Sequence, residues 1–325
     1  MKKFSIVLPI YGNEKNLPIT VPYIIENIPV LFPDYQVEVV MVNDGSPDNS
    51  YEIMKEYQKK YPQIIKIASF TRNFGQAMAW DYGVSIASGD AIGVISADLQ
   101  DPLELFADML KEWENGYQLV YGTRIKRKDR GQLFSKITHG LIHRFISERY
   151  PKGGFDFFVL DRAAAHEYLK AEERNGSPQL LMLWHGFSHK ALPYERKKRE
   201  VGKSCWTFSK KIKGFIDIFV SNSYLPLRVM SVIGGISAFA GFIYAIYIVI
   251  SAIVLKLSGK TGGVLGWSSI VTIIIFFSGL ILLSLGIIGE YLWRIFDYVK
   301  HRPRYVVKEI IDETTDSTDT KTLHS

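Results

Sequence analysis

Two long stretches without a charged side chain, residues 229–255 and 264–289, most constrain what this chain can fold into. As α-helices rising about 1.5 Å per residue, each would extend about 39–40 Å, which exceeds the roughly 30 Å hydrocarbon core of a bilayer. Buried helices of soluble proteins are rarely this long and this free of charge. The sequence therefore predicts two transmembrane helices, joined as a hairpin by a short connection.

The charged residues beside these stretches predict their orientation. Basic side chains are frequent on both outer flanks, namely Lys210, Lys211, Lys213 and Arg228 before the first stretch and Arg294, Lys300, Arg302, Arg304 and Lys308 after the second. The short connection has only Lys256 and Lys260. Because cytoplasmic flanks are enriched in Lys and Arg, we expect a multi-pass protein of the inner (plasma) membrane with both termini in the cytoplasm.

Composition divides the chain into four parts. Residues 1–207 resemble an ordinary globular domain, and residues 229–296 hold the two predicted transmembrane helices. Between them, residues 208–228 mix lysines with large apolar side chains, as in a helix at a membrane interface; the alternative is a helix packed on the preceding domain. Residues 297–325 are expected to form a cytoplasmic tail with a disordered end. The net charge of +6 is concentrated beside the apolar stretches, which favours a membrane surface over nucleic acid as the partner.

Within the first part, short apolar strands alternate with helical segments. The expected strands are residues 4–10, 37–42, 64–70, 91–95 and 118–121, and the expected helices are residues 16–27, 51–61, 76–87 and 103–115. This alternation predicts an α/β fold with a mainly parallel sheet and helices on both of its faces.

Polar clusters follow three of these strands, at residues 11–14, 43–48 and 96–101. Because the carboxyl ends of parallel strands meet at one edge, the clusters should converge on one crevice. Asp98, with Gln100 or Asp101, offers the oxygen ligands that Mg²⁺ or Mn²⁺ prefers, and such a metal would hold a diphosphate. The alternative is that Asp101 only caps a helix opening at Pro102. There is no Gly-x-Gly-x-x-Gly and no complete Gly-x-x-x-x-Gly-Lys-Ser/Thr loop, which argues against a dinucleotide oxidoreductase and a P-loop ATPase.

Four motifs in order carry a family resemblance. They are Pro9-Ile10-Tyr11-Gly12-Asn13-Glu14, Asp44-Gly45-Ser46-Pro47-Asp48, Arg72-Asn73-Phe74-Gly75 and Ala97-Asp98-Leu99-Gln100. Together they resemble the inverting family 2 glycosyltransferases, and more narrowly the polyprenyl-phosphate glycosyltransferases, which include bactoprenol glucosyltransferases and dolichyl-phosphate mannose synthases. The resemblance implies a GT-A (Rossmann-like) catalytic domain followed by the two-helix transmembrane hairpin.

The resemblance also implies roles for individual residues. Donor binding falls to Pro9, Tyr11, Glu14, Asp44, Asn73, Gly75, Ala97 and Asp98. Asp98 and Gln100 would lie at the metal, where Ser96 replaces the usual first Asp of the motif.

The resemblance also implies phosphate-binding and catalytic roles for residues beyond the four motifs. Arg124 directly follows a strand and would bind phosphate, since a guanidinium can grip phosphate with two parallel bonds. Arg199 and Lys203 are expected to bind phosphate as well, with Lys203 supplying the charge that Cys205 lacks. Asp156 stands where the catalytic carboxylate is expected; the alternative is an Asp that caps a turn after two glycines.

From this resemblance we expect inverting transfer of a sugar from a nucleotide sugar, UDP-glucose or a related UDP-hexose, to undecaprenyl or another polyprenyl phosphate. It would use Mg²⁺ or Mn²⁺ at the cytoplasmic membrane face and give a β-linked product; we also expect a homo-oligomer. Two alternatives stay open, a membrane-anchored nucleotide-sugar-binding protein without turnover and a processive polysaccharide synthase. The second lacks a Gln-x-x-Arg-Trp motif.

Overall fold

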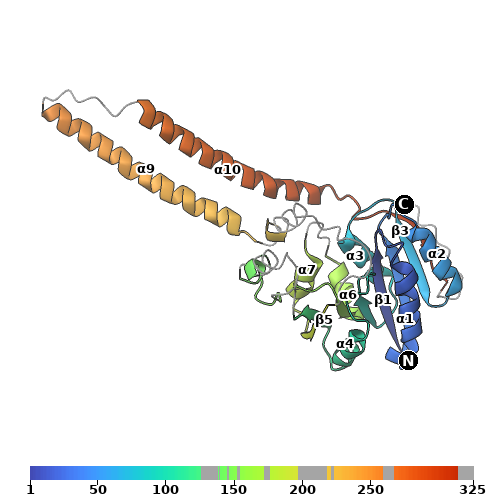
Figure 1. Cartoon of the computed structure of the whole chain (residues 1–325). Helices are drawn as coiled ribbons and strands as arrows, with labels where there is room; N and C mark the ends of the chain where they lie inside the picture. Colours follow the sequence, from blue (N-terminus) through green and yellow to red (C-terminus); the bar gives the residue numbers. More distant parts are fainter. Residues whose placement is uncertain are drawn as a thin grey trace. The chain divides into compact units, whose positions relative to one another are not determined.

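The computed structural model (Figure 1) describes residues 1–125, 138, 140–144, 146–151, 154–171, 176–196, 218–220, 223–258 and 267–313. The chain forms two compact units. One comprises Met1–Phe215 together with Arg302–Ser325, and the other comprises Ile216–His301. The last part of the chain thus belongs to the same unit as the first.

A sheet of eight strands in the order β7-β5-β6-β4-β1-β2-β3-β8 forms the centre of the first unit. Its strands are β1 (Lys2–Ile10), β2 (Tyr35–Asn43), β3 (Ile65–Phe70), β4 (Ala91–Val94), β5 (Leu119–Arg124), β6 (Phe158–Asp161), β7 (His189–Tyr194) and β8 (Val307–Ile311). Strands β4, β1, β2 and β3 are parallel neighbours, which confirms the predicted parallel sheet for this half. Strand β6 runs antiparallel to both β4 and β5, so the whole sheet is mixed.

Helices cover both faces of the sheet, as expected. Among the described residues of this unit, the helices include α1 (Leu17–Leu31), α2 (Ser50–Lys60), α3 (Gln76–Ile86), α4 (Leu105–Glu114), α6 (Arg162–Leu169) and α7 (Pro178–Trp184). Alternate β1 residues such as Phe4 and Leu8 join the core cluster that contains α1, α2 and α4 side chains. Val7 points to the other face, where a Cβ on Gly83 of α3 would lie 2.3 Å from its Cγ1. A residue larger than glycine would therefore push α3 away from β1.

Strand β8 was not foreseen. Residues 297–325 were predicted to form a tail, but residues 307–311 pair antiparallel with β3 at the edge of the sheet. The long apolar stretch ends before residue 307, and two of the five residues of β8 are charged. The local sequence pattern therefore did not predict a strand here. The partner strand β3, more than two hundred positions earlier in the sequence, supplies the reason for its formation.

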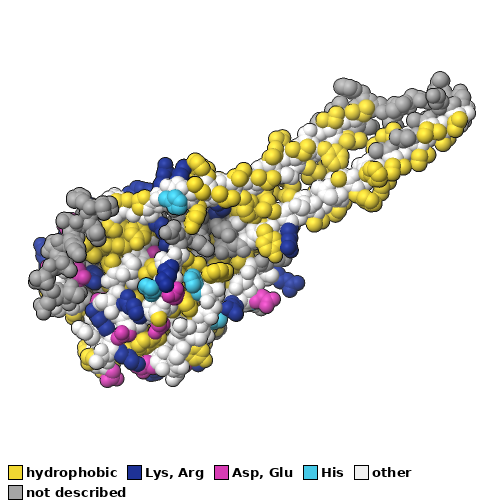
Figure 2. Space-filling model, turned by 180° about the vertical axis from the view of Figure 1, so that it is seen from behind, with side chains coloured by type: hydrophobic (Ala, Val, Ile, Leu, Met, Phe, Trp, Pro, Cys, Tyr) yellow, Lys and Arg dark blue, Asp and Glu magenta, His cyan; other side chains and the backbone are white. Residues whose placement is uncertain are grey.

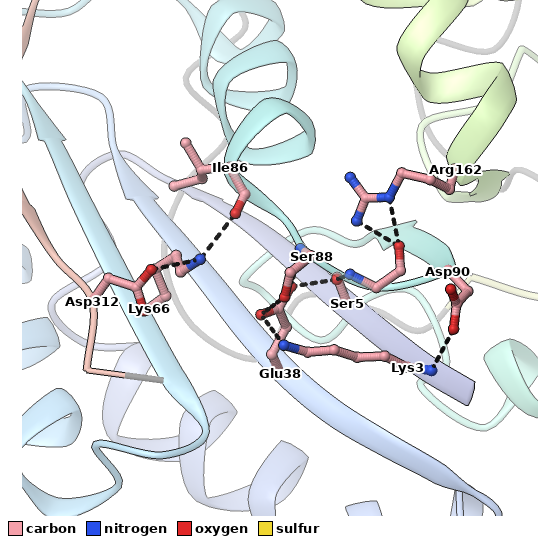
Figure 3. Close-up of polar contacts among 10 residues, drawn as sticks. Lys3, Ser5, Glu38, Lys66, Ile86, Ser88, Asp90, Arg162 and Asp312 are labelled. Atoms are coloured by element: carbon pink, nitrogen blue, oxygen red, sulfur yellow. Dashed lines mark hydrogen bonds and ion pairs between the residues drawn. The ribbon is translucent and has the colours of Figure 1, made fainter. Parts of the chain in front are cut away.

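A buried carboxylate, Glu38 on β2, organises a polar network across the starts of the central strands (Figure 3). It accepts hydrogen bonds from Ser5 Oγ at 2.5 Å and Ser88 Oγ at 2.6 Å, and Lys3 Nζ lies 3.1 Å from it. Burial alone would raise the pKa of Glu38, but the hydrogen bonds from Ser5, Ser88 and Lys3 outweigh burial and lower this pKa below its usual value.

Glu38→Gln should lower the free energy of unfolding by about 1–3 kcal/mol at neutral pH, because the neutral amide bonds these donors more weakly. A lowered folded-state pKa means that the contribution of Glu38 is present above its ordinary pKa of 4.5 and is lost as the pH falls further. Thermal unfolding at several pH values should therefore show a difference between the two proteins that shrinks below about pH 4.5. An equal difference at every pH would contradict the charged state of Glu38.

The second unit contains two long helices, α9 (Leu225–Leu257) and α10 (Trp267–Val299). Both are long and apolar enough to cross a membrane, and among the described residues the candidate spans are Leu225–Ile248 and Phe276–Val299. Large apolar side chains are exposed along both helices, and Figure 2 shows this surface as largely hydrophobic. This agrees with the two predicted spans and is consistent with membrane association. The predicted interfacial helix at residues 208–228 falls largely outside the described residues.

Candidate active site

The loops that follow β1 and β2 are bound to each other by hydrogen bonds. The backbone N–H of Asn13 donates to Ser50 Oγ at 2.8 Å, and that of Glu14 donates to Asp48 Oδ2 at 3.1 Å. In return, the N–H of Asn49 donates to Glu14 Oε2 at 3.3 Å. Two of the three predicted polar clusters therefore meet at one edge of the sheet, as the parallel strand order requires.

Asp44, at the end of β2, holds the loop of residues 71–75. Its two carboxylate oxygens accept from the backbone N–H groups of Phe74 at 2.6 Å and Gly75 at 2.9 Å. Burial raises the pKa of the Asp44 carboxyl, although these two N–H groups and Arg72 act in the opposite direction. Gly45 lies so close to this loop, at a φ of +61°, that a Cβ would come within 2.3 Å of the carbonyl carbon of Arg72. The fold thus fixes the 71–75 loop against β2.

The residues predicted to bind the donor lie around this edge. Tyr11 and Asn73 are exposed, whereas Pro9 and Glu14 are partly buried. Ala97 is buried, and its carbonyl accepts a hydrogen bond from Thr20 Oγ1 of α1 at 2.8 Å. Their roles in donor binding stay predictions, and the carboxylate of Asp44 serves at least to hold the adjacent loop.

The predicted metal ligands Asp98 and Gln100 lie on a sharp turn after β4. Leu99 between them has a φ of +52°, a left-handed conformation that costs an ordinary residue roughly 1–2 kcal/mol. The turn brings the backbone N–H of Gln100 to 3.3 Å from Asp98 Oδ1. Strain of this kind is retained where the surrounding structure or a function requires it, and here it lies beside a partly exposed carboxylate.

A second group of polar side chains surrounds Asp156. Arg124 at the end of β5 forms an ion pair with it, with 2.7 Å between Nη2 and Oδ2. Gln179 of α7 donates to the other carboxylate oxygen at 3.2 Å. The Arg124 side chain is 9% exposed, whereas that of Asp156 is 46% exposed. The buried guanidinium therefore holds a carboxylate that faces solvent. Neither the contact with Gln179 nor the ion pair between Arg124 and Asp156 was predicted from the sequence.

Asp101 is buried and is linked to Arg124 through the hydroxyl of Tyr194. Tyr194 donates to Asp101 Oδ1 at 2.5 Å and accepts from Arg124 Nε at 3.4 Å, and Arg196 Nε lies 3.3 Å from the same carboxylate oxygen. Asp101 Oδ2 has no hydrogen-bond partner among the described residues. Burial raises the pKa of Asp101, which Arg196 and Tyr194 oppose.

The cap interpretation of Asp101 is wrong, because α4 begins at Leu105 with Glu104 at its N-cap. Asp101 instead connects the turn of Asp98 to the ends of β5 and β7. Tyr194 and Arg196 were not identified as site residues, since only the folded sheet brings them to Asp101.

Two of the predicted phosphate-binding residues, Arg199 and Lys203, lie outside the described residues. Among the residues that the structure does describe, no three His, Cys, Asp or Glu side chains form a group that could hold a metal ion by themselves.

Comparison with known proteins gives the family. The model of glycosyl transferase family 2 matches residues 5–167. YkcC, an uncharacterized glycosyltransferase of Bacillus subtilis (strain 168), is 37% identical in an alignment of length 312 that covers 94% of each chain. The chain belongs to glycosyl transferase family 2. The resemblance inferred from the four motifs is thereby confirmed, as is the α/β fold class.

This family 2 glycosyltransferase also resembles the bactoprenol glucosyl transferase of Shigella phage SfV. The two are 31% identical, and the match covers 94% of this chain and 98% of the phage protein. Among solved structures, the mannosyltransferase PcManGT from Pyrobaculum calidifontis, in complex with GDP-Man and Mn²⁺, is similar with a TM-score of 0.44 and 15% identity. That match covers 61% of this chain and 57% of the mannosyltransferase, less than two thirds of its length.

Proposed function

We propose that this glycosyltransferase transfers a sugar, glucose or a related hexose, from a UDP-sugar to undecaprenyl or another polyprenyl phosphate. The observation that carries the proposal is the likeness to a bactoprenol glucosyl transferase over 94% of the chain, apolar helices included. A lipid acceptor would also account for an α/β unit and two long apolar helices in one chain.

The donor would lie at the carboxyl ends of β1, β2 and β4. Tyr11 and Glu14 would contact the base and ribose beside Asp44, with the 71–75 loop closing that side through Asn73 and Gly75. The bonds from Asp44 to Phe74 and Gly75 support this assignment, because they fix the loop before the donor arrives. A preformed loop lowers the entropy lost on binding.

A divalent cation fits the turn after β4. Mg²⁺ and Mn²⁺ are bound by one or two carboxylates together with substrate phosphates, so Asp98 and the amide oxygen of Gln100 would suffice on the protein's side. When bound, the cation would neutralise charge on the diphosphate leaving group. Asp101 is less suited to the first coordination shell, since Tyr194 and Arg196 already engage its carboxylate.

The acceptor phosphate would approach the ion pair of Arg124 and Asp156. A phosphate monoester carries about 1.5 to 2 negative charges at pH 7, so its oxygen attacks without strong base catalysis. That oxygen forms the new bond to the anomeric carbon as the bond to the diphosphate breaks and UDP leaves with the electron pair. Attack from the opposite side inverts the configuration, giving a β-linked product from an α-linked donor. Asp156 would orient the acceptor and Arg124 would balance its charge, together with Arg199 and Lys203.

A panel assay tests the function. The purified full-length chain is incubated with undecaprenyl phosphate, Mg²⁺ or Mn²⁺, and UDP-glucose, UDP-galactose, UDP-N-acetylglucosamine or GDP-mannose in turn. We expect one UDP-hexose to support release of UDP that depends on the lipid. Tight binding of a nucleotide sugar without release of UDP would favour the alternative of a binding protein without turnover.

We further propose that both termini lie in the cytoplasm and that α9 and α10 cross the membrane as a hairpin. In a Cys205→Ser background, an impermeant maleimide added to sealed cells should label Ser258→Cys, close to the end of α9, but not Ser317→Cys. Lysed cells serve as the control, in which both cysteines should react. Labelling of the tail in sealed cells would overturn this orientation. A homo-oligomer remains a prediction.

A further inference from the structure

The segment of residues 302–312, here called the C-terminal strap, follows the second apolar helix and adds the last strand to the sheet. Its strand β8 pairs antiparallel with β3, with Ile311 opposite Ile67 and Val307 opposite Phe70. The strap lies far outside residues 5–167, which match the family model. Without it, β3 would present an unpaired edge.

Ion pairs and hydrogen bonds anchor the strap at three places. Arg304 pairs with the buried Asp81 of α3, which also accepts a hydrogen bond from Tyr168 of α6. At the other end, Asp312 lies 2.8 Å from Lys66, whose amine also donates to the Ile86 carbonyl at 3.0 Å (Figure 3). Glu309 accepts from Tyr51 Oη at 2.7 Å. Breaking a buried pair is costly, so these contacts indicate a permanent part of the unit.

Between these anchors the strap contacts the base of the 71–75 loop. The ring of Tyr305 stacks on Phe70 with 5.2 Å between centroids and 11° between planes. Phe70 in turn meets Phe74 edge-on at 5.8 Å. The backbone N–H of Thr71 donates to the Val306 carbonyl at 3.0 Å. Asp44 holds the loop through Phe74 and Gly75, and the strap holds its beginning through Phe70 and Thr71.

We propose that Tyr305 is a positioning residue for donor binding, and that the strap completes the nucleotide-sugar site from beyond the second apolar helix. The inference rests on the proposed function in that it takes the 71–75 loop to contact the donor. Tyr305 touches neither donor nor acceptor in this account. It acts by stacking on Phe70 and thereby limiting the conformations open to Phe74 and Gly75.

The test uses the full-length protein and three variants. Tyr305→Ala removes the stacked ring, whereas Tyr305→Phe retains it. Tyr35→Ala is the matched control. Like Tyr305, Tyr35 is half-buried and packs against an aromatic ring, that of Phe4, and its hydroxyl donates to Glu114. It lies at the start of β2, whereas Asp44 and the 71–75 loop lie beyond the other end of that strand. An aromatic pair contributes about 0.5–1.5 kcal/mol, which corresponds to about 2- to 12-fold.

For Tyr305→Ala we expect faster hydrogen exchange at the amides of Phe74 and Gly75 and a donor KM raised about 2- to 12-fold, with the acceptor KM unchanged. Tyr305→Phe and Tyr35→Ala should match the unchanged protein in both measurements. Unchanged exchange in the loop, or a rise of both KM values together, would overturn the positioning role. Failure of the proposed function is a separate result, since it would leave the unchanged protein without turnover on any nucleotide sugar.

Discussion

Asp98→Ala should reduce turnover at least 100-fold while the protein stays folded. Asp98 is the carboxylate on the turn after β4 that we assign to the metal, and removing a group that stabilises charge in the transition state typically costs about 10²–10³ in rate. The initial rate is measured with saturating donor and acceptor over a range of Mn²⁺ concentrations. Asp98→Asn should also be impaired, because an amide oxygen binds a hard cation more weakly than a carboxylate.

Asp108→Ala is the matched control for this experiment. Asp108 is an exposed carboxylate on α4 whose partner is Lys111 at 3.0 Å, so its loss should leave the rate unchanged. Full activity of Asp98→Ala would contradict the role of Asp98 at the metal. Full activity of the unchanged protein in excess EDTA would contradict a metal requirement. If Asp98→Ala shows no cooperative thermal unfolding transition, it is not folded, and Asp98→Asn takes its place in the comparison.

Arg124→Ala should lower kcat/KM for the lipid acceptor about 10- to 150-fold. The buried guanidinium is assigned to the acceptor phosphate, and a charge-assisted hydrogen bond contributes roughly 1.5–3 kcal/mol. Arg124→Lys should recover only part of the loss, because an ammonium cannot make two parallel bonds to phosphate. The measurement is kcat, the acceptor KM and the donor KM of each variant under the same conditions.

Lys190→Ala is the control for Arg124→Ala. It tests whether removing another ion-paired cation from this part of the sheet also changes the acceptor and donor KM. Lys190 lies near the start of β7, where it pairs with Glu112 at 3.0 Å, whereas Arg124 lies at the end of the neighbouring strand β5. Its loss should leave both KM values unchanged. A donor KM that rises with Arg124→Ala while the acceptor KM stays constant would move Arg124 from the acceptor to the leaving diphosphate.

Local patterns predicted the first half of the sheet and the meeting of its loops. Apolar runs such as residues 37–42 allow few structures other than a buried strand, and parallel strands bring Glu14 and Asp48 to the same edge. The two apolar helices were equally evident, since length and lack of charge leave few alternatives.

The contacts that lie far apart in sequence could not be predicted in the same way. From the sequence, a helix cap was one interpretation of Asp101, because Pro102 and an expected helix follow it. In the structure its carboxylate contacts Tyr194 and Arg196. Likewise, β8 carries charges at Lys308 and Glu309 and becomes a strand because β3 offers a free edge. In both cases the decisive partner lies at least ninety positions away.

In the proposed reaction the acceptor is a lipid phosphate and transfer inverts the configuration at the anomeric carbon of the sugar. Analysis of the product formed from a radiolabelled α-linked UDP-hexose and undecaprenyl phosphate tests both parts at once. We expect a single β-linked sugar on a lipid monophosphate, with one UDP released per sugar transferred. An α-linked product, a lipid diphosphate sugar, or sugar found only in a growing glycan would contradict it.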